Sequence, residues 1–146
     1  MLYRGFHQKF ADGRLLNPWR INPRRPQHSH ILVHQIADDW FLQRFGVKAR
    51  SETVICSTSL EVARSFGRNG AFGQVIPNEP YSIIYSEDVT DFLQYGTEIA
   101  ELTTESVEQW LASKQFHFSV SLDDLPVGQN IEVMLDCGSY EFRSVS

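Results

Sequence analysis

Three short motifs, far apart in the chain of 146 residues, carry side chains that suit chemistry on an anionic, hydroxyl-bearing ligand. The motifs are Tyr3-Arg4-Gly5, Ser57-Thr58-Ser59, and Glu132 within the run Asn130-Ile131-Glu132-Val133-Met134-Leu135. The guanidinium of Arg4 can hold phosphate oxygens through a forked contact that a lysine reproduces poorly. The carboxylate of Glu132 can accept a hydroxyl hydrogen and place negative charge beside a developing cation. Each motif is common alone, so their order along the chain carries the argument.

This order resembles the ADP-ribosyltransferase family of the Arg-Ser-Glu type. In that family a strand arginine, an S-T-S strand and a late catalytic glutamate build an NAD pocket. The resemblance spans about Leu2 to Leu135, because a long helix before the S-T-S strand and a loop before the glutamate strand also match. It implies an enzyme that uses NAD as a substrate, without a metal, and transfers ADP-ribose to a macromolecular acceptor.

The resemblance implies that Glu132 is the catalytic residue and that Arg4 holds the NAD pyrophosphate. Breaking the bond between nicotinamide and ribose passes through an oxocarbenium-like transition state, in which hydrogen bonds to the ribose 2-hydroxyl strengthen. A carboxylate in that place provides preorganised electrostatic stabilisation of about 3–4 kcal/mol. The residue types at both positions therefore suit the implied reaction.

Further roles follow from the same resemblance. Gly5 is expected to let the cofactor approach the backbone, and Ser57 to fix the nicotinamide ribose or support Glu132. Thr58 and Ser59 are expected to shape the strand end and to cap the helix that follows. The family often has Gln or Glu two residues before the catalytic glutamate, where this chain has Asn130. That departure leaves open whether the acceptor is a protein side chain or a nucleic-acid base.

The segment from Lys9 to Pro26 is rich in prolines and turn-forming residues, and we expect it to lack regular structure. It also contains Trp19 and most of the cationic excess of the first 25 residues. Long loops held by rigid elements often carry binding function. We therefore expect it to close over the NAD phosphates or to contact an anionic acceptor. The candidate acceptor-binding residues are Asn130, Arg20, Arg24 and Arg25.

The chain as a whole is acidic, with a net charge of −5, so a broad nucleic-acid surface is disfavoured. Between Glu87 and Glu108 seven acidic residues occur without a Lys or Arg. Two interpretations stay open for this segment, namely a solvated face and a docking surface for a basic partner.

Structural interpretations also stand beside each functional one. Arg4 could be an exposed partner of some acid, the S-T-S motif a simple helix cap, and Glu132 a solvated carboxylate. His30 and His34 have the spacing of zinc-binding histidines, but the glutamate of that motif is absent and we expect no metal. Cys56 and Cys137 lie in apolar strand-like runs, which predicts reduced, buried thiols without a nucleophilic role.

The elements that must position these residues are readable from hydrophobic periodicity and from capping residues. We expect a first helix at 29–45 that Gly46 ends, and a second at 60–66 that Ser59 caps and Gly67 ends. A third helix is expected to begin at Thr103 or Thr104. We expect strands at 1–6, 52–57, 73–76, 81–85, 116–122, 131–137 and 140–143. Strands segregated from helices predict an α+β fold. The resemblance implies a pair of packed β-sheets flanked by helices, as a single domain over residues 1–146.

No apolar run is long enough to span a membrane, and the N-terminus lacks the apolar core of a signal peptide, so we expect a cytoplasmic protein. The resemblance favours an intracellular bacterial or phage effector, such as the toxin of a toxin–antitoxin or phage-defence system, with a possible antitoxin or inhibitor protein as partner. Two alternatives remain, an NAD glycohydrolase on the same fold and a non-enzymatic interaction module.

Overall fold

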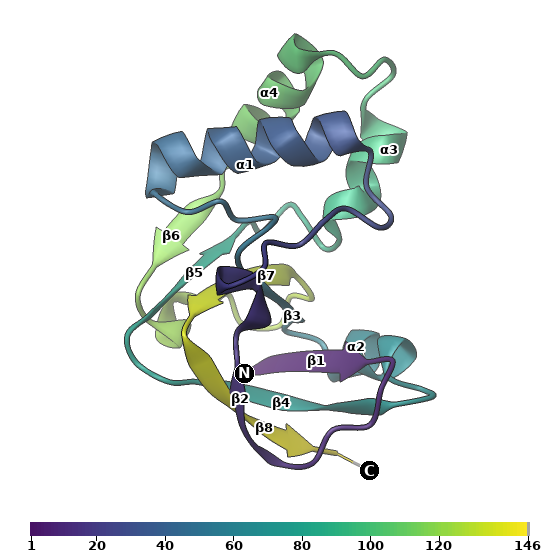
Figure 1. Cartoon of the computed structure of the whole chain (residues 1–146). Helices are drawn as coiled ribbons and strands as arrows, with labels where there is room; N and C mark the ends of the chain where they lie inside the picture. Colours follow the sequence, from purple (N-terminus) through teal and green to yellow (C-terminus); the bar gives the residue numbers. More distant parts are fainter. Residues whose placement is uncertain (146) are drawn as a thin grey trace.

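Eight antiparallel strands form one hydrogen-bonded sheet in the computed structural model, which describes residues 1–145 (Figure 1). Their order in the sheet is β2-β8-β4-β1-β3-β7-β5-β6. The strands are β1 (Leu2–Phe6), β2 (Gly13–Leu16), β3 (Val54–Ser57), β4 (Ala71–Pro77), β5 (Tyr81–Tyr85), β6 (His117–Ser119), β7 (Glu132–Cys137) and β8 (Ser139–Ser144). The α-helices are α1 (Ile31–Phe45), α2 (Leu60–Phe66), α3 (Tyr95–Glu98) and α4 (Thr104–Ser113). The predicted α+β class is confirmed.

The sheet consists of two halves that meet at one residue pair. In the β1 half (β2, β8, β4, β1), strand β1 pairs with β4 along its whole length, from Leu2 to Phe6. In the β3 half (β3, β7, β5, β6), strand β3 pairs with β7 from Val54 to Ser57. Tyr3 of β1 and Ser57 of β3 are the pair that joins them. The structure therefore has one continuous sheet with a narrow junction where the sequence led us to expect two sheets.

Two apolar clusters hold this arrangement together. The first takes residues from both halves, among them Leu2 and Phe142 from the β1 half and Val54 and Leu135 from the β3 half, so the two halves pack against each other. The second joins the opposite face of the β3 half to helices α1 and α4. Figure 1 shows these helices together at one end of the molecule, while α2 lies beside β1. The two faces of the β3 half are thus covered by different elements.

Local capping explains where the helices begin and end. The predicted start of α1 at Ser29 is wrong by one residue, because the imidazole Nδ1 of His30 accepts a hydrogen bond from the Leu32 N–H and serves as the cap. Gly46 ends α1 in the left-handed conformation, at φ 77°, as predicted. Helix α2 has the predicted bounds with Ser59 as its cap, and α4 is capped by Thr103.

The segment from Lys9 to Pro26 is more regular than the sequence suggests. Strand β2 lies within it and pairs with β8 from Gly13 to Leu16, and a short 3-10 helix, η1, covers Pro18–Arg20. The side chain of the buried Asn17 donates to the carbonyls of Glu52 and Cys137, 3.0 Å away in each case. The expected structureless loop is wrong here, because an edge strand can recruit a segment of weak intrinsic preference.

Gly5 lies where helix α2 packs on β1. A Cβ atom at this position would approach the Ala63 carbonyl oxygen to 2.2 Å and the Gly67 backbone nitrogen to 2.6 Å. Both are backbone atoms, so the helix would have to move. The space that the absent side chain leaves is thus filled by α2, whereas the sequence led us to expect a ligand there.

Replacing Gly5 by alanine is therefore expected to destabilise the fold by about 1–3 kcal/mol, the usual cost of overpacking. Gly96, in α3, provides the matched control, because a Cβ there meets nothing within 4 Å. Urea unfolding of both variants checks the prediction. Equal stability of Gly5→Ala and Gly96→Ala would show that α2 does not depend on this close approach.

Candidate active site

The three motif strands are neighbours in the sheet, in the order β1, β3, β7. Tyr3 lies directly opposite Ser57, and Ser57 lies directly opposite Glu132. Residues paired in this way point to the same face, with Cβ atoms about 5 Å apart. The register therefore brings the side chains of Ser57 and Glu132 together from positions 75 residues apart in the sequence.

The S-T-S motif fastens the segment that precedes Glu132. The Thr58 hydroxyl donates to the Gln129 carbonyl at 2.8 Å and accepts from the Ile131 N–H at 3.0 Å, while the Thr58 N–H donates to the Ile131 carbonyl. We call these three hydrogen bonds the Thr58 clasp, and the exposed Asn130 lies between the two residues that they hold, Gln129 and Ile131. Thr58 thus sets the position of the residue expected to help select the acceptor.

The two serines of the motif serve the local backbone. The Ser57 hydroxyl oxygen accepts a hydrogen bond from the Ser59 N–H at 3.0 Å, and the Ser59 hydroxyl oxygen accepts one from the Val62 N–H at 3.3 Å. The capping interpretation of Ser59 is confirmed. Ser57 in addition faces Glu132 across the strand pair.

The carboxylate of Glu132 is held by Arg50, a residue that the sequence gave no reason to select. Arg50 Nη1 lies 2.7 Å from Glu132 Oε2, and the two side chains are only 8% and 15% exposed. The guanidinium of Arg50 also packs over the Phe92 ring, 4.1 Å from its centroid. The interpretation of Glu132 as a solvated carboxylate is therefore wrong.

Backbone contacts fix the place of Arg50. Asp38 Oδ1 accepts hydrogen bonds from the N–H groups of Arg50 and Ser51, at 2.9 and 3.1 Å. The guanidinium of Arg24 donates to the carbonyls of Arg50 and Thr53, at 2.8 Å each. Arg24, expected to bind the acceptor, thus binds backbone carbonyls next to the site.

Arg24 lies in a markedly cationic environment. Burial, together with the positive charges of Arg4 and Arg50, lowers the pKa of Arg24 to about 9. Its guanidinium also stacks over the Trp19 ring at 4.4 Å. The nearby carboxylates are Glu132 and Asp38, so the three arginines Arg4, Arg24 and Arg50 leave an excess of positive charge that favours an anion.

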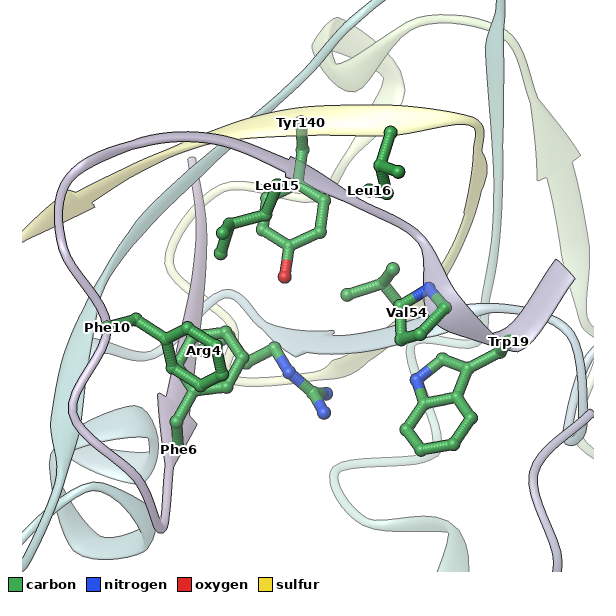
Figure 2. A pocket seen from close by; sticks show the side chains of 9 residues that line it. Arg4, Phe6, Phe10, Leu15, Leu16, Trp19, Val54 and Tyr140 are labelled. Carbon is green, nitrogen blue, oxygen red and sulfur yellow. The ribbon is translucent and has the colours of Figure 1, made fainter. Parts of the chain in front are cut away.

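Arg4 lies beyond the junction, where β1 and β3 part. It follows Tyr3 and so leaves β1 on the opposite face. Its guanidinium donates across the gap to the Ile55 carbonyl. It lines a cavity of about 350 Å³ whose walls include Phe6, Trp19 and Tyr140. Figure 2 shows the Arg4 guanidinium pointing into this cavity, with Trp19 across from Phe6.

Ser57 and Glu132 do not line that cavity. Arg4 and Glu132 leave the sheet on opposite faces, since Leu2 and Val133 pack in the first apolar cluster whereas Met134, on the Glu132 side, packs in the second. The structure thus brings Ser57 and Glu132 together on one face of the sheet. Arg4 lies on the other face, where its guanidinium contacts the backbone of β3 at the Ile55 carbonyl. The single pocket expected around all three side chains is not formed by residues 1–145.

The other candidates have separate places. Arg20 forms an ion pair with Asp136 at 2.9 Å, and Arg25 is exposed. Burial lowers the pKa of His34, and the nearby carboxylate of Asp38 opposes this shift. Within residues 1–145, no three His, Cys, Asp or Glu side chains are arranged to hold a metal ion.

The cysteines are as predicted. Cys56 and Cys137 are free and buried, and burial raises their pKa values to about 12 and 11. Both therefore remain thiols at neutral pH.

The acidic residues from Glu87 to Glu108 are exposed, and Glu98 among them pairs with Lys114. This exposure fits a solvated face.

Searches among known protein families, curated proteins and solved structures find no match to this chain. None of the helices in the described residues combines the length and apolarity needed to cross a membrane.

Replacing Thr58 by valine should loosen the clasp at Gln129 and Ile131, because it removes two hydrogen bonds at nearly constant volume. We expect a loss of about 1–2 kcal/mol in unfolding free energy and faster amide exchange at Ile131. Thr58→Ser keeps the hydroxyl and should stay close to the wild type. Unchanged exchange at Ile131 in Thr58→Val would contradict the clasp.

Proposed function

We propose that this protein transfers ADP-ribose from NAD to a macromolecular acceptor, with Glu132 as the residue that acts on the ribose. The observation that supports this most is the register Tyr3–Ser57–Glu132 across three adjacent strands. Motifs that are weak when taken singly in the sequence lie on three neighbouring strands, with Ser57 and Glu132 side by side and Arg4 on the opposite face of the sheet. The adjacency of these strands supports the resemblance to the Arg-Ser-Glu ADP-ribosyltransferases.

In the proposed reaction the bond between the nicotinamide nitrogen and ribose C1′ breaks, and nicotinamide leaves with the electron pair. The acceptor nucleophile then forms a bond to C1′ and gives up its proton. Glu132 accepts a hydrogen bond from the ribose 2-hydroxyl and places negative charge beside the sugar cation. Its restricted exposure, 15%, favours this role, because a poorly hydrated carboxylate interacts more strongly with a nearby cation.

The cavity at Arg4 suits the phosphate-bearing part of the dinucleotide. Arg4 contributes guanidinium donors, Trp19 and Phe6 contribute aromatic surface, and Arg24 adds positive charge behind Trp19. Apolar walls with a few charged groups are typical of small-molecule sites. For one NAD molecule to engage both Arg4 and Glu132, it must pass over the gap between β1 and β3. We propose that path for the pyrophosphate.

The acceptor would approach Glu132 from the exposed segment around Asn130, where no carboxylate stands two residues before the glutamate. The exposed Arg25 is available for an anionic acceptor, whereas Arg20 is paired with Asp136 and Arg24 is bound to the backbone. Attack by water in place of the acceptor would make the protein a glycohydrolase, and the fate of the ADP-ribose distinguishes the two.

Glu132→Gln is expected to lower the rate of nicotinamide release from NAD by about 100-fold or more. The amide retains an oxygen that can accept from Arg50, so the fold should survive, with a loss of about 1–3 kcal/mol from the weakened ion pair. Nicotinamide release, measured together with label transfer from adenosine-labelled NAD to cell-extract macromolecules, checks the prediction.

Glu141→Gln is the matched control, a half-buried strand glutamate on β8 that lies outside the site. Wild-type turnover by Glu132→Gln, or absence of NAD turnover in the wild-type protein across a range of extracts, would contradict the proposed function. Nicotinamide release without label transfer would favour the glycohydrolase.

A further inference from the structure

The ion pair between Arg50 and Glu132 is unusual in that both partners are nearly buried and one carboxylate oxygen is left over. Arg50 binds Oε2, and in residues 1–145 no hydrogen bond is made to Oε1. We infer that Arg50 is a positioning residue, which holds the Glu132 carboxylate in one orientation with Oε1 available to a ligand hydroxyl. This inference rests on the proposed function for its activity readout, but not for its structural readout.

Arg50 is itself fixed, which distinguishes a positioning role from that of a mobile gate. Its backbone N–H is held by Asp38 and its carbonyl by Arg24. Its guanidinium packs over Phe92 and is shielded from solvent. Because its N–H, its carbonyl and its guanidinium are all in contact, the Arg50 side chain has little freedom to change conformation. The carboxylate that it binds is therefore restricted in the same way.

Arg50 is the cation that touches Glu132. The other charged or titratable groups around the pair are Arg4, Arg24, Asp38, His34 and Cys56. Within residues 1–145, Arg50 is the cation that lies within hydrogen-bond distance of the Glu132 carboxylate. Without Arg50, Glu132 would be left as a partly buried charge whose partner is gone.

Arg50→Met tests this role, because the thioether side chain can still cover Phe92 but carries no charge. We expect kcat for NAD consumption to fall roughly 10–100-fold with KM for NAD little changed, as for a misplaced group. Arg50→Lys keeps the charge and should recover part of the lost kcat. Arg64→Met, which removes an exposed arginine paired with Glu61, should leave kcat and KM unchanged.

A second readout needs no substrate. Structures of the wild-type and Arg50→Met proteins should differ in the position of the Glu132 side chain, which is expected to leave its wild-type orientation when Arg50 is lost and to keep it in part in Arg50→Lys. If the wild-type protein does not consume NAD, the proposed function fails, while these structures still decide the role of Arg50. If Arg50→Met does not fold, Arg50→Lys carries the comparison. An unmoved Glu132 side chain in Arg50→Met, or faster turnover on loss of Arg50, would overturn the inference.

Discussion

The single residue pair Tyr3–Ser57 is the constraint on which the rest of this structure depends. It is the point where the β1 half and the β3 half of the sheet are joined. Because each strand is paired along its length with its other neighbour, the junction determines the register of all three motif strands at once. A slip of one residue between β3 and β7 would turn Glu132 to the opposite face. The apolar clusters on the two faces of β7 prevent such a slip, since Val133 and Met134 would exchange places.

The narrow junction also creates the gap that Arg4 bridges. Backbone carbonyls freed from a ladder need partners, and the Ile55 carbonyl takes the Arg4 guanidinium. Similarly, Arg24 satisfies the carbonyls of Arg50 and Thr53 just before β3 begins. Arginines thus replace strand hydrogen bonds where the sheet divides. The result is a concentration of positive charge next to Glu132, in a protein whose net charge is negative.

Helices α1, α2 and α4 were predictable because their signals are local, whereas the four-residue helix α3 was not predicted. Ser59 and Gly67 mark α2, and Gly46 marks the end of α1 by a conformation that few other residues adopt. Strand β2 was not predictable, because its partner β8 lies about 125 residues away and the strand itself has no strong pattern. Arg50 was not predicted as a site residue for the same reason, because its role comes from a contact with Glu132, a residue 82 positions away. Gly5 shows the reverse case, since a glycine in a motif indicated close approach correctly, but what approaches is helix α2.

The most direct measurement of the central claim is a structure of the Glu132→Gln variant with NAD bound, in which slow turnover preserves the dinucleotide. The account predicts the 2-hydroxyl of the nicotinamide ribose within hydrogen-bond distance of residue 132, and the pyrophosphate at the Arg4 guanidinium across the gap between β1 and β3. NAD bound with its ribose away from residue 132 would contradict the account, as would the absence of binding when the variant is folded.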